Sequence, residues 1–184
     1  MIETPRLILR DWRAADLAPF AAMSADPAVM ETLGGALLTQ AQSRAFIESA
    51  EAQIARRGFG RWAVERREDG AFIGVVGLAP VGKDVPLGGF EIAWRLARNA
   101  WGFGYATEAA RAALAEAFER GGLQQVWAFT SVPNLRSQAV MGRLGLTRRA
   151  DLDFDHPALP RRHPQRPHMV WAALPQPAPP ASSA

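Results

Sequence analysis

The chain has 184 residues, of which 48% are hydrophobic and 21% are charged, proportions typical of one soluble globular domain. It contains no cysteine, which excludes disulfides, thiolate metal sites and a cysteine nucleophile. The pI is near 10.4 although the net charge is only +3, because Lys83 is the only lysine and arginine stays charged to very high pH. The pI is therefore weak evidence for nucleic-acid binding.

The first half of the chain carries clear signals of local structure. Residues 6–10 place three apolar side chains between two arginines, a short pattern that predicts a strand. Thr39 and Gln42 form a capping box, which marks a helix start, and Gly58 supplies the stop. From such signals we expect a strand at 6–10, a helix from Asp16 to near Pro27, a helix from Thr39 to about Arg57, and hairpin strands at 62–66 and 72–76.

The second half alternates strands with helices after a polar loop at 80–89. The expected elements are strands at 90–96, 125–131 and 168–174, and helices from about Ala106 to Arg120 and from Asn134 to Gly145. Residues 1–174 therefore predict a single domain, and the tail 175–184, rich in Pro, Ala and Ser, is expected to be disordered.

A glycine-rich loop joins the strand at 90–96 to the next helix. Gly102 and Gly104 permit tight backbone geometry, and the helix that follows presents free N–H groups at its positive end. This arrangement favours an anion such as phosphate. Taken alone, the loop is also compatible with a simple turn before a helix.

Two other phosphate-binding motifs fit the chain poorly. A dinucleotide-binding fingerprint fails because Thr107 stands where the third glycine belongs. Residues 77–84 nearly spell a P-loop, but the segment ends in Asp84 instead of a magnesium-binding Ser or Thr, and Val85-Pro86 does not open a helix.

At the glycine loop the chain resembles the GNAT superfamily of N-acetyltransferases, and within it the RimJ/RimL-like branch of ribosomal-protein N-terminal acetyltransferases. The superfamily signature Gln/Arg-x-x-Gly-x-Gly/Ala aligns with 101–106, where Trp101 replaces Gln/Arg. Segments 4–10, 90–94, 134–137 and 144–146 also resemble the branch, so the resemblance covers roughly Ile2 to Leu174.

The resemblance implies an α/β (α+β) GNAT fold, with a mixed, mostly antiparallel central sheet and helices on both faces. The central strands, 90–96 and 125–131, would splay apart to admit acetyl-coenzyme A as co-substrate. By resemblance, the cofactor-binding residues are Trp94, Arg95 and Leu96 along the pantetheine, Trp101, Gly102, Phe103, Gly104, Tyr105, Ala106 and Thr107 around the pyrophosphate, and Asn134.

Two side chains are candidates for catalysis. Glu91 would face the splay and act as the base that deprotonates the amine, directly or through water; alternatively it is a structural carboxylate paired with an arginine. Many superfamily members protonate the leaving thiolate with a tyrosine, but Met141 stands at that position. Ser137 is the remaining candidate acid, or a helix-start residue that bonds to Asn134, which could itself serve as the helix N-cap.

The expected function is direct transfer of acetyl to a primary amine, without a covalent enzyme intermediate. The acceptor is a small molecule or a protein N-terminus, and both stay open. An alternative is a non-catalytic acyl-coenzyme A sensor or interaction module on the same fold. A nucleic-acid-binding module would rest on clustered arginines alone, without a recognition motif, and is not expected: Arg56, Arg57, Arg61, Arg66 and Arg67.

The segment 153–167 and its surroundings hold all three histidines: His156, His163 and His168. Their spacing fits no standard zinc arrangement, so no metal is expected. The segment could line the acceptor site or form a solvated polar loop. No apolar run approaches the roughly 20 residues of a membrane span, and the N-terminus lacks the pattern of a secretory signal, so we expect a cytoplasmic protein without membrane contact.

Overall fold

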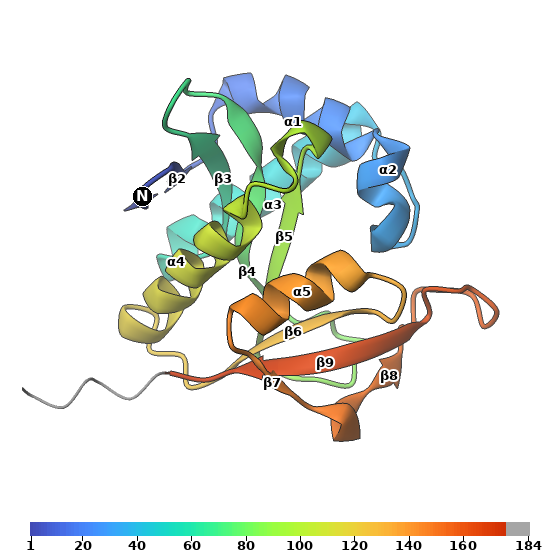
Figure 1. The fold of residues 1–184 in the computed structure, drawn as a ribbon. Helices are drawn as coiled ribbons and strands as arrows, with labels where there is room; N and C mark the ends of the chain where they lie inside the picture. The colour runs from blue at the N-terminus through green and yellow to red at the C-terminus, as the bar shows by residue number, and fades with distance from the viewer. Residues whose placement is uncertain (176–184) are drawn as a thin grey trace, which may run out of the picture.

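One sheet of nine strands runs through the computed structural model of the chain, and helices cover both of its faces (Figure 1). The structure describes residues 1–175. The strands are β1 (Ile2–Glu3), β2 (Leu7–Arg10), β3 (Arg61–Arg66), β4 (Phe72–Pro80), β5 (Phe90–Leu96), β6 (Val126–Ser131), β7 (Thr147–Arg148), β8 (Phe154–Asp155) and β9 (Pro167–Ala173). Their order is β1-β2-β3-β4-β5-β6-β9-β7, with β8 paired to β9.

The helices divide between the two faces of the sheet. They are α1 (Leu17–Ser24), α2 (Pro27–Met30), α3 (Gln40–Arg57), α4 (Tyr105–Glu119) and α5 (Leu135–Arg143), with short 3-10 turns η1 (Ala14–Asp16), η2 (Glu31–Leu33), η3 (Arg98–Ala100) and η4 (Ala150–Leu152). Trp62 and Val64 pack into the core beneath α4, whereas Ala63 between them packs into a second core beneath α1 and α3. Successive side chains of β3 point to opposite faces of the sheet and so contribute to both hydrophobic layers. Within residues 1–175, no helix is both long and apolar enough to cross a bilayer.

Most of the expected elements are confirmed, and the differences have local causes. The helix expected between Asp16 and the neighbourhood of Pro27 is present as α1, which has Asp16 at its N-cap position and ends at Ser24; the short helix α2, which begins at Pro27 with Asp26 as its N-cap, was not expected. Proline fits the first turn of a helix but not its interior, so the first helix ends before Pro27 and a new helix begins there. The strands β1, β7 and β8 have two residues each, too few to show a period in the sequence. Of the tail 175–184, only Pro175 lies within the described residues.

The centre of the sheet is splayed, and the predicted fold class is confirmed. β4 pairs antiparallel with β5 along the whole of β5, and β6 pairs antiparallel with β9 along the whole of β6. By contrast, β5 and β6 are parallel and meet at one residue pair only, Glu91 with Trp127. Beyond that pair the strands diverge: in Figure 1, β5 rises steeply while β6 and β9 run almost across the view.

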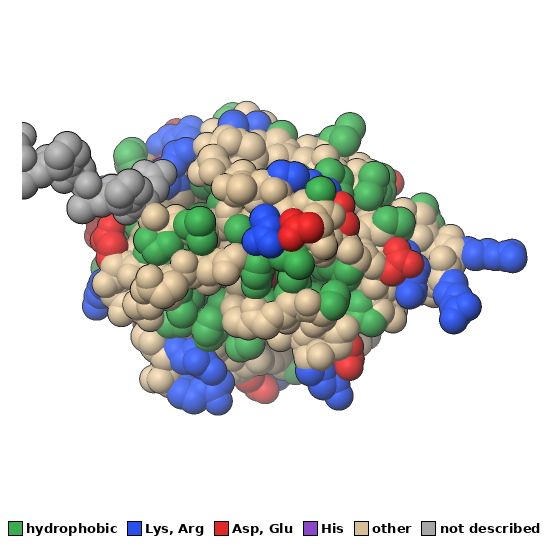
Figure 2. All heavy atoms as spheres, turned by 90° about the horizontal axis from the view of Figure 1, so that it is seen from below, with side chains coloured by type: hydrophobic (Ala, Val, Ile, Leu, Met, Phe, Trp, Pro, Cys, Tyr) green, Lys and Arg blue, Asp and Glu red, His purple; other side chains and the backbone are tan. Residues whose placement is uncertain are grey.

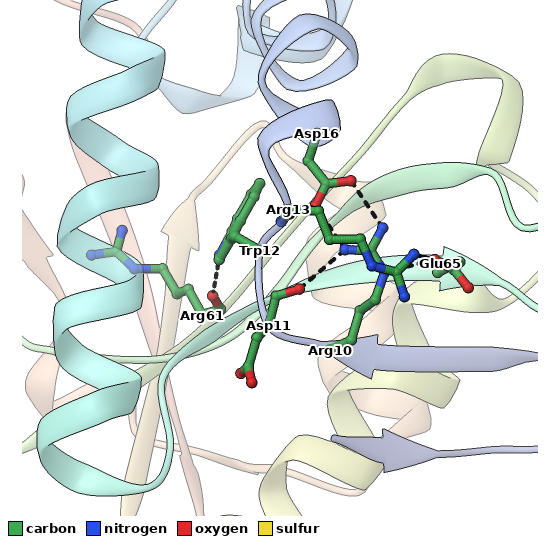
Figure 3. A network of polar contacts seen from close by, with 7 residues as sticks. All are labelled: Arg10, Asp11, Trp12, Arg13, Asp16, Arg61 and Glu65. Carbon is green, nitrogen blue, oxygen red and sulfur yellow. Dashed lines mark hydrogen bonds and ion pairs between the residues drawn. The ribbon is translucent and has the colours of Figure 1, made fainter.

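A buried ion-pair network ties the start of α1 to the sheet (Figure 3). Arg10 donates to both carboxylate oxygens of Asp16, at 2.7 and 2.9 Å, and to Glu65 at 2.6 Å. Arg10 and Asp16 are only 5% and 3% exposed. Burial alone raises the pKa of Asp16, but hydrogen bonds from Arg10 and from the Arg13 backbone outweigh it and hold that pKa below its usual value.

We expect Asp16→Asn to lower the free energy of unfolding by about 3 kcal/mol, because it leaves part of the buried Arg10 charge without its partner. The matched control is Asp151→Asn, which breaks an exposed Arg149–Asp151 pair and should cost less than about 1 kcal/mol. Urea denaturation at pH 7 measures both.

The same experiment has a pH signature. Because the folded pKa of Asp16 is lowered, its stabilisation is present at neutral pH and is lost as the pH falls below about 4. The difference between wild type and Asp16→Asn should therefore shrink on acidification. A difference that is absent at pH 7, or that does not depend on pH, would contradict the role given to this network.

Candidate active site

A cavity of about 830 Å³ lies where β5 leaves β6, a volume typical of sites for small molecules and cofactors. Its walls come from the end of β5, the glycine loop, the first turn of α4, α5, and the segment formed by α2 and η2. Every residue expected to bind the cofactor lines it: Trp94, Arg95, Leu96, Trp101, Gly102, Phe103, Gly104, Tyr105, Ala106, Thr107 and Asn134. Segments far apart in the sequence thus meet in one cavity.

The glycine loop has the geometry of an anion site. Gly102 and Gly104 have φ values of +86° and +81°, a region that L side chains rarely adopt. Within residues 1–175, no protein acceptor takes the backbone N–H groups of residues 102–107. These amides open α4, which has 15 residues, so the helix dipole adds to their attraction for an anion.

Side-chain contacts hold the loop in place. The Trp101 indole donates to the Leu96 carbonyl at 2.8 Å, which folds the loop back onto the end of β5. On the far side of the helix turn, Glu108 accepts hydrogen bonds from Arg6 and Thr4 at 2.7 Å each. This ties the start of α4 to the chain before β2, so the amides point toward the cavity from a fixed backbone.

Sequence reasoning missed two arginines and one wall of the cavity. Arg136 and Arg143 of α5 line it; the Arg136 guanidinium lies 4.3 Å from the centre of the Trp101 ring, and Arg143 donates to Thr107 at 3.2 Å. They are seven residues apart on one helix face, a spacing that could have been noticed beside Asn134. The α2–η2 wall, including Val29 and Leu33, carried no signal because it approaches from a distant part of the chain.

Asn134 and Ser137 form a bonded unit with Trp94. The Asn134 side chain caps α5 by accepting a hydrogen bond from the Ser137 backbone N–H at 3.2 Å. The expectation that Asn134 could serve as the helix N-cap is therefore confirmed. The Ser137 hydroxyl oxygen accepts from the Asn134 amide at 3.0 Å and from the Trp94 indole at 3.3 Å. A hydroxyl has two lone pairs and one proton. With both lone pairs engaged, the Ser137 proton is free to be donated into the cavity.

Glu91 lies at the vertex of the splay and outside the set of residues that line the cavity. Burial raises its pKa to about 7, although the positive charge of Arg61 works in the opposite direction. It shares one face of β5 with Ala93 and Arg95, and Ala93 between them is exposed even though the strand is central. The exposed Ala93 leaves an open position directly beside this carboxyl group.

Met141, which stands where many members of the superfamily have a tyrosine, and Tyr105, the only tyrosine of the chain, occupy different environments. Met141 is 1% exposed and packs in the core beneath α4. Tyr105 is in the first turn of α4, where its ring stacks on Phe103 at 5.5 Å and the Arg6 guanidinium lies 4.9 Å from its centre. It lines the cavity at the end formed by the glycine loop.

The remaining charged groups do not build a second site of the kinds considered. None of the residues lining the cavity comes from 153–168, although Gln165 in that segment bonds to Glu31 and Gly34 beside it. Among the described residues, no group of three or more ligating side chains could hold a metal ion. Arg66 pairs with Asp69 and Arg67 with Glu3, and Figure 2 shows both signs of charge scattered over the face that it views.

Comparison with known proteins identifies the family. Residues 6–147 match the acetyltransferase (GNAT) domain family. The uncharacterized protein YkkB of Bacillus subtilis is 31% identical to the chain over 78% of the chain and 83% of its own length. FsC-acetyl coenzyme A-N(2)-transacetylase of Aspergillus fumigatus is 39% identical over 49% of the chain, a match that spans only 40% of that relative's length.

Solved structures share the fold over almost the whole chain. A GNAT-family acetyltransferase from Bacillus anthracis has a TM-score of 0.77 at 22% identity, and the match covers 94% of this chain and 97% of the chain of that protein. RimL, a ribosomal L7/L12 alpha-N-protein acetyltransferase in complex with coenzyme A, has a TM-score of 0.73 at 15% identity, covering 93% and 95%. Spermidine N-acetyltransferase from Vibrio cholerae, in complex with coenzyme A and spermine, has a TM-score of 0.70 at 17% identity, covering 93% and 96%.

The family match covers well over half of the chain and includes the strand, the glycine loop and the helix that form the cavity. The chain therefore belongs to the GNAT family of acetyltransferases and is an acetyl-coenzyme A-dependent N-acetyltransferase.

Proposed function

We propose that this acetyltransferase moves acetyl directly to a primary amine, without a covalent enzyme intermediate. The observation that carries the proposal is the splay: one end of the resulting cavity has a row of free amides, and the open position beside Glu91 lies on β5, the strand whose residues Trp94 and Arg95 line the cavity. Such an arrangement lets two substrates approach the same point from opposite sides. With no cysteine in the chain, direct transfer is the simplest route.

The cavity fits acetyl-coenzyme A part by part. The amides of residues 102–107, with Arg136 and Arg143 close by, would hold the pyrophosphate. The edge of β5 that β6 leaves unpaired, at Trp94 and Arg95, would bond to the amide groups of the pantetheine. Since the amide of Asn134 already bonds to Thr130 and Ser137, its main contribution is to orient Ser137 against the ligand.

The proton transfers are assigned to Glu91 and Ser137. Acetyl-coenzyme A supplies an acetyl group activated as a thioester. Fewer than about 0.1% of lysine-like amines are neutral at pH 7, so the acceptor must lose a proton before it reacts. Glu91, with its pKa near 7, takes this proton through water. A backbone N–H of β5 near Trp94 stabilises the acetyl oxygen, and Ser137 gives its proton to the departing sulfur.

Several finer assignments belong to the proposal. The chain would join the RimJ/RimL-like branch, on the strength of its segment resemblances. Residues 1–174 would form one domain that acts in the cytoplasm. Among proteins of this fold, RimL is named for a protein N-terminus and the Vibrio cholerae enzyme for spermidine, so the fold accommodates both kinds of acceptor.

Acetyl-coenzyme A should raise the free energy of unfolding by about 2.7 kcal/mol at 100 times its dissociation constant, measured by thermal denaturation. Gly104→Ala should lose most of this gain, because a side chain at φ +81° distorts the amide row. Gly58→Ala is the matched control: it is strained in the same way, at φ +77° after α3, and should keep the full gain. An unchanged melting curve at millimolar ligand would contradict the proposal.

Glu91→Gln should reduce kcat/KM at least about 100-fold and leave the dissociation constant of acetyl-coenzyme A unchanged. Because the base must be ionised, wild-type kcat/KM should rise with pH through about 7, and the variant should lose this step. Thiol release followed from pH 5.5 to 8.5 measures both. Binding without turnover in the wild type would instead support the sensor alternative.

Ser137→Ala should lower kcat about tenfold or more and have little effect on KM for the acceptor, because it removes the proton donor to the sulfur. Thr130→Val is the control, since it removes only the other hydroxyl that Asn134 contacts. Equal rate losses in the two variants would indicate that Ser137 merely supports Asn134.

A further inference from the structure

Two half-buried arginines on the α1–α3 face of the sheet form no ion pair with a carboxylate. Arg61 begins β3 and Arg95 lies near the end of β5. The Nε atoms of both are buried without a hydrogen-bond partner, and neither arginine forms an ion pair with another described residue. Apart from a 3.1 Å bond from Arg95 to the Ser24 hydroxyl, both guanidinium groups rest on hydrophobic rings. Charges removed from water are ordinarily paired with an opposite charge, so an anionic ligand would be stabilised between these two groups.

The two guanidinium groups contact the same aromatic ring. Their central carbons are 4.6 and 5.6 Å from the centre of the same ring, that of Phe46 on α3. Burial lowers the pKa of both guanidinium groups, although the charge of Glu91 partly opposes this at Arg61, and the charge of Arg61 helps to bring the pKa of Arg95 to about 10. Arg95 therefore feels the positive charge of Arg61 across a poorly solvated space.

The strand register shows which part of the sheet surface lies beside the two arginines. Arg61 lies opposite Gly77 of β4, which in turn pairs with Ala93 of β5. These two neighbours are the smallest residues, so they leave space over the sheet between Glu91 and Arg95. Ala93 is exposed there, and Arg95 itself lines the cavity. The open position over Ala93 is thus bordered by one carboxyl group and two guanidinium groups.

This position is separate from the phosphate-binding end of the cavity. Arg95 contacts Ser24, Phe20 and Phe46, which belong to α1 and α3, whereas the amide row belongs to α4 on the opposite face of the sheet. The positive charge is therefore available to the acceptor, and the phosphates of the cofactor have their own donors in the loop and α5.

We propose that Arg95, with Arg61 behind it, binds an anionic group of the acceptor, and that the acceptor is a small primary amine carrying a carboxylate or a phosphate. The inference rests on the direct acetyl transfer proposed above. An acceptor of this kind places its ammonium group beside Glu91 and its anion on the arginines. A polyamine would meet two uncompensated positive charges, and an uncharged peptide N-terminus would leave both unpaired.

The test compares matched acceptors in the thiol-release assay. Amino acids are paired with their amides, and ethanolamine phosphate is paired with ethanolamine; spermidine and an amidated peptide complete the set. We expect kcat/KM to favour the anionic member of a pair about 10- to 100-fold. The amide's amine loses its proton more easily than that of the acid, so a preference for the acid comes from the anion. The two anion types distinguish carboxylate from phosphate.

Arg95→Met should remove this preference, so that kcat/KM with the anionic acceptor falls about 10- to 100-fold relative to kcat/KM with its neutral partner in the same variant. Arg61→Met should weaken the preference a few-fold, and Arg95→Lys should restore part of it. Arg44→Met, at an exposed position on α3, is the control. Because Arg95 has no ion-pair partner, its replacement by an apolar side chain of similar length should preserve folding.

A binding experiment separates this inference from the proposed function. With coenzyme A present, an amino acid should raise the Tm of the wild type and not that of Arg95→Met, and its amide should raise neither. Selective binding without thiol release would support the anion site and overturn the proposed transfer. Equal turnover of acids, amides, spermidine and the peptide would overturn the anion site and leave the transfer intact.

Discussion

The single contact between β5 and β6 determines what the rest of the molecule can do. Two strands that meet only at Glu91 and Trp127 leave backbone groups on both sides of the gap without strand partners. Buried backbone groups must be satisfied by something, and water or a ligand with amide groups is what remains. The full pairing of β4 with β5 and of β6 with β9 keeps the gap from closing, because each diverging strand is held by its other edge. The cavity is therefore a consequence of sheet topology.

The parts of the site that lie in one continuous segment could be predicted from the sequence, whereas the parts that are brought together only by folding could not. The glycine loop, the start of α4 and the cap at Asn134 depend on local rules: glycine at positive φ, free amides at a helix start, a side chain that caps the next helix. The α2–η2 wall reaches the cavity only through tertiary packing. Likewise, the position of Ser137 between Asn134 and Trp94 requires β5 and α5 to be brought together, which no spacing within the chain specifies.

Arg61 illustrates why a charge cluster in a sequence is ambiguous. In the sequence it belongs to a run of arginines from 56 to 67 that suggests a basic surface. In the fold, strand alternation separates its members: Arg61 and Ala63 point to the α1–α3 face, and Arg66 pairs with Asp69 at the hairpin turn. The period of the strand was available from sequence. What covers each face was not, because that depends on how α1 and α3 pack across the sheet.

The α1–α3 face carries two groups of buried charge that differ in one respect. Arg10, Ala63, Val75 and Arg95 form one row across β2 to β5. At one end of the row, Arg10 has Asp16 and Glu65 at hydrogen-bonding distance. At the other end, Arg95 has only a serine hydroxyl. Both ends bear the desolvation cost of a buried cation, but only the first recovers it within the protein. The second would recover it from an anionic group that enters the site, which is the reason for proposing an acceptor that carries such a group.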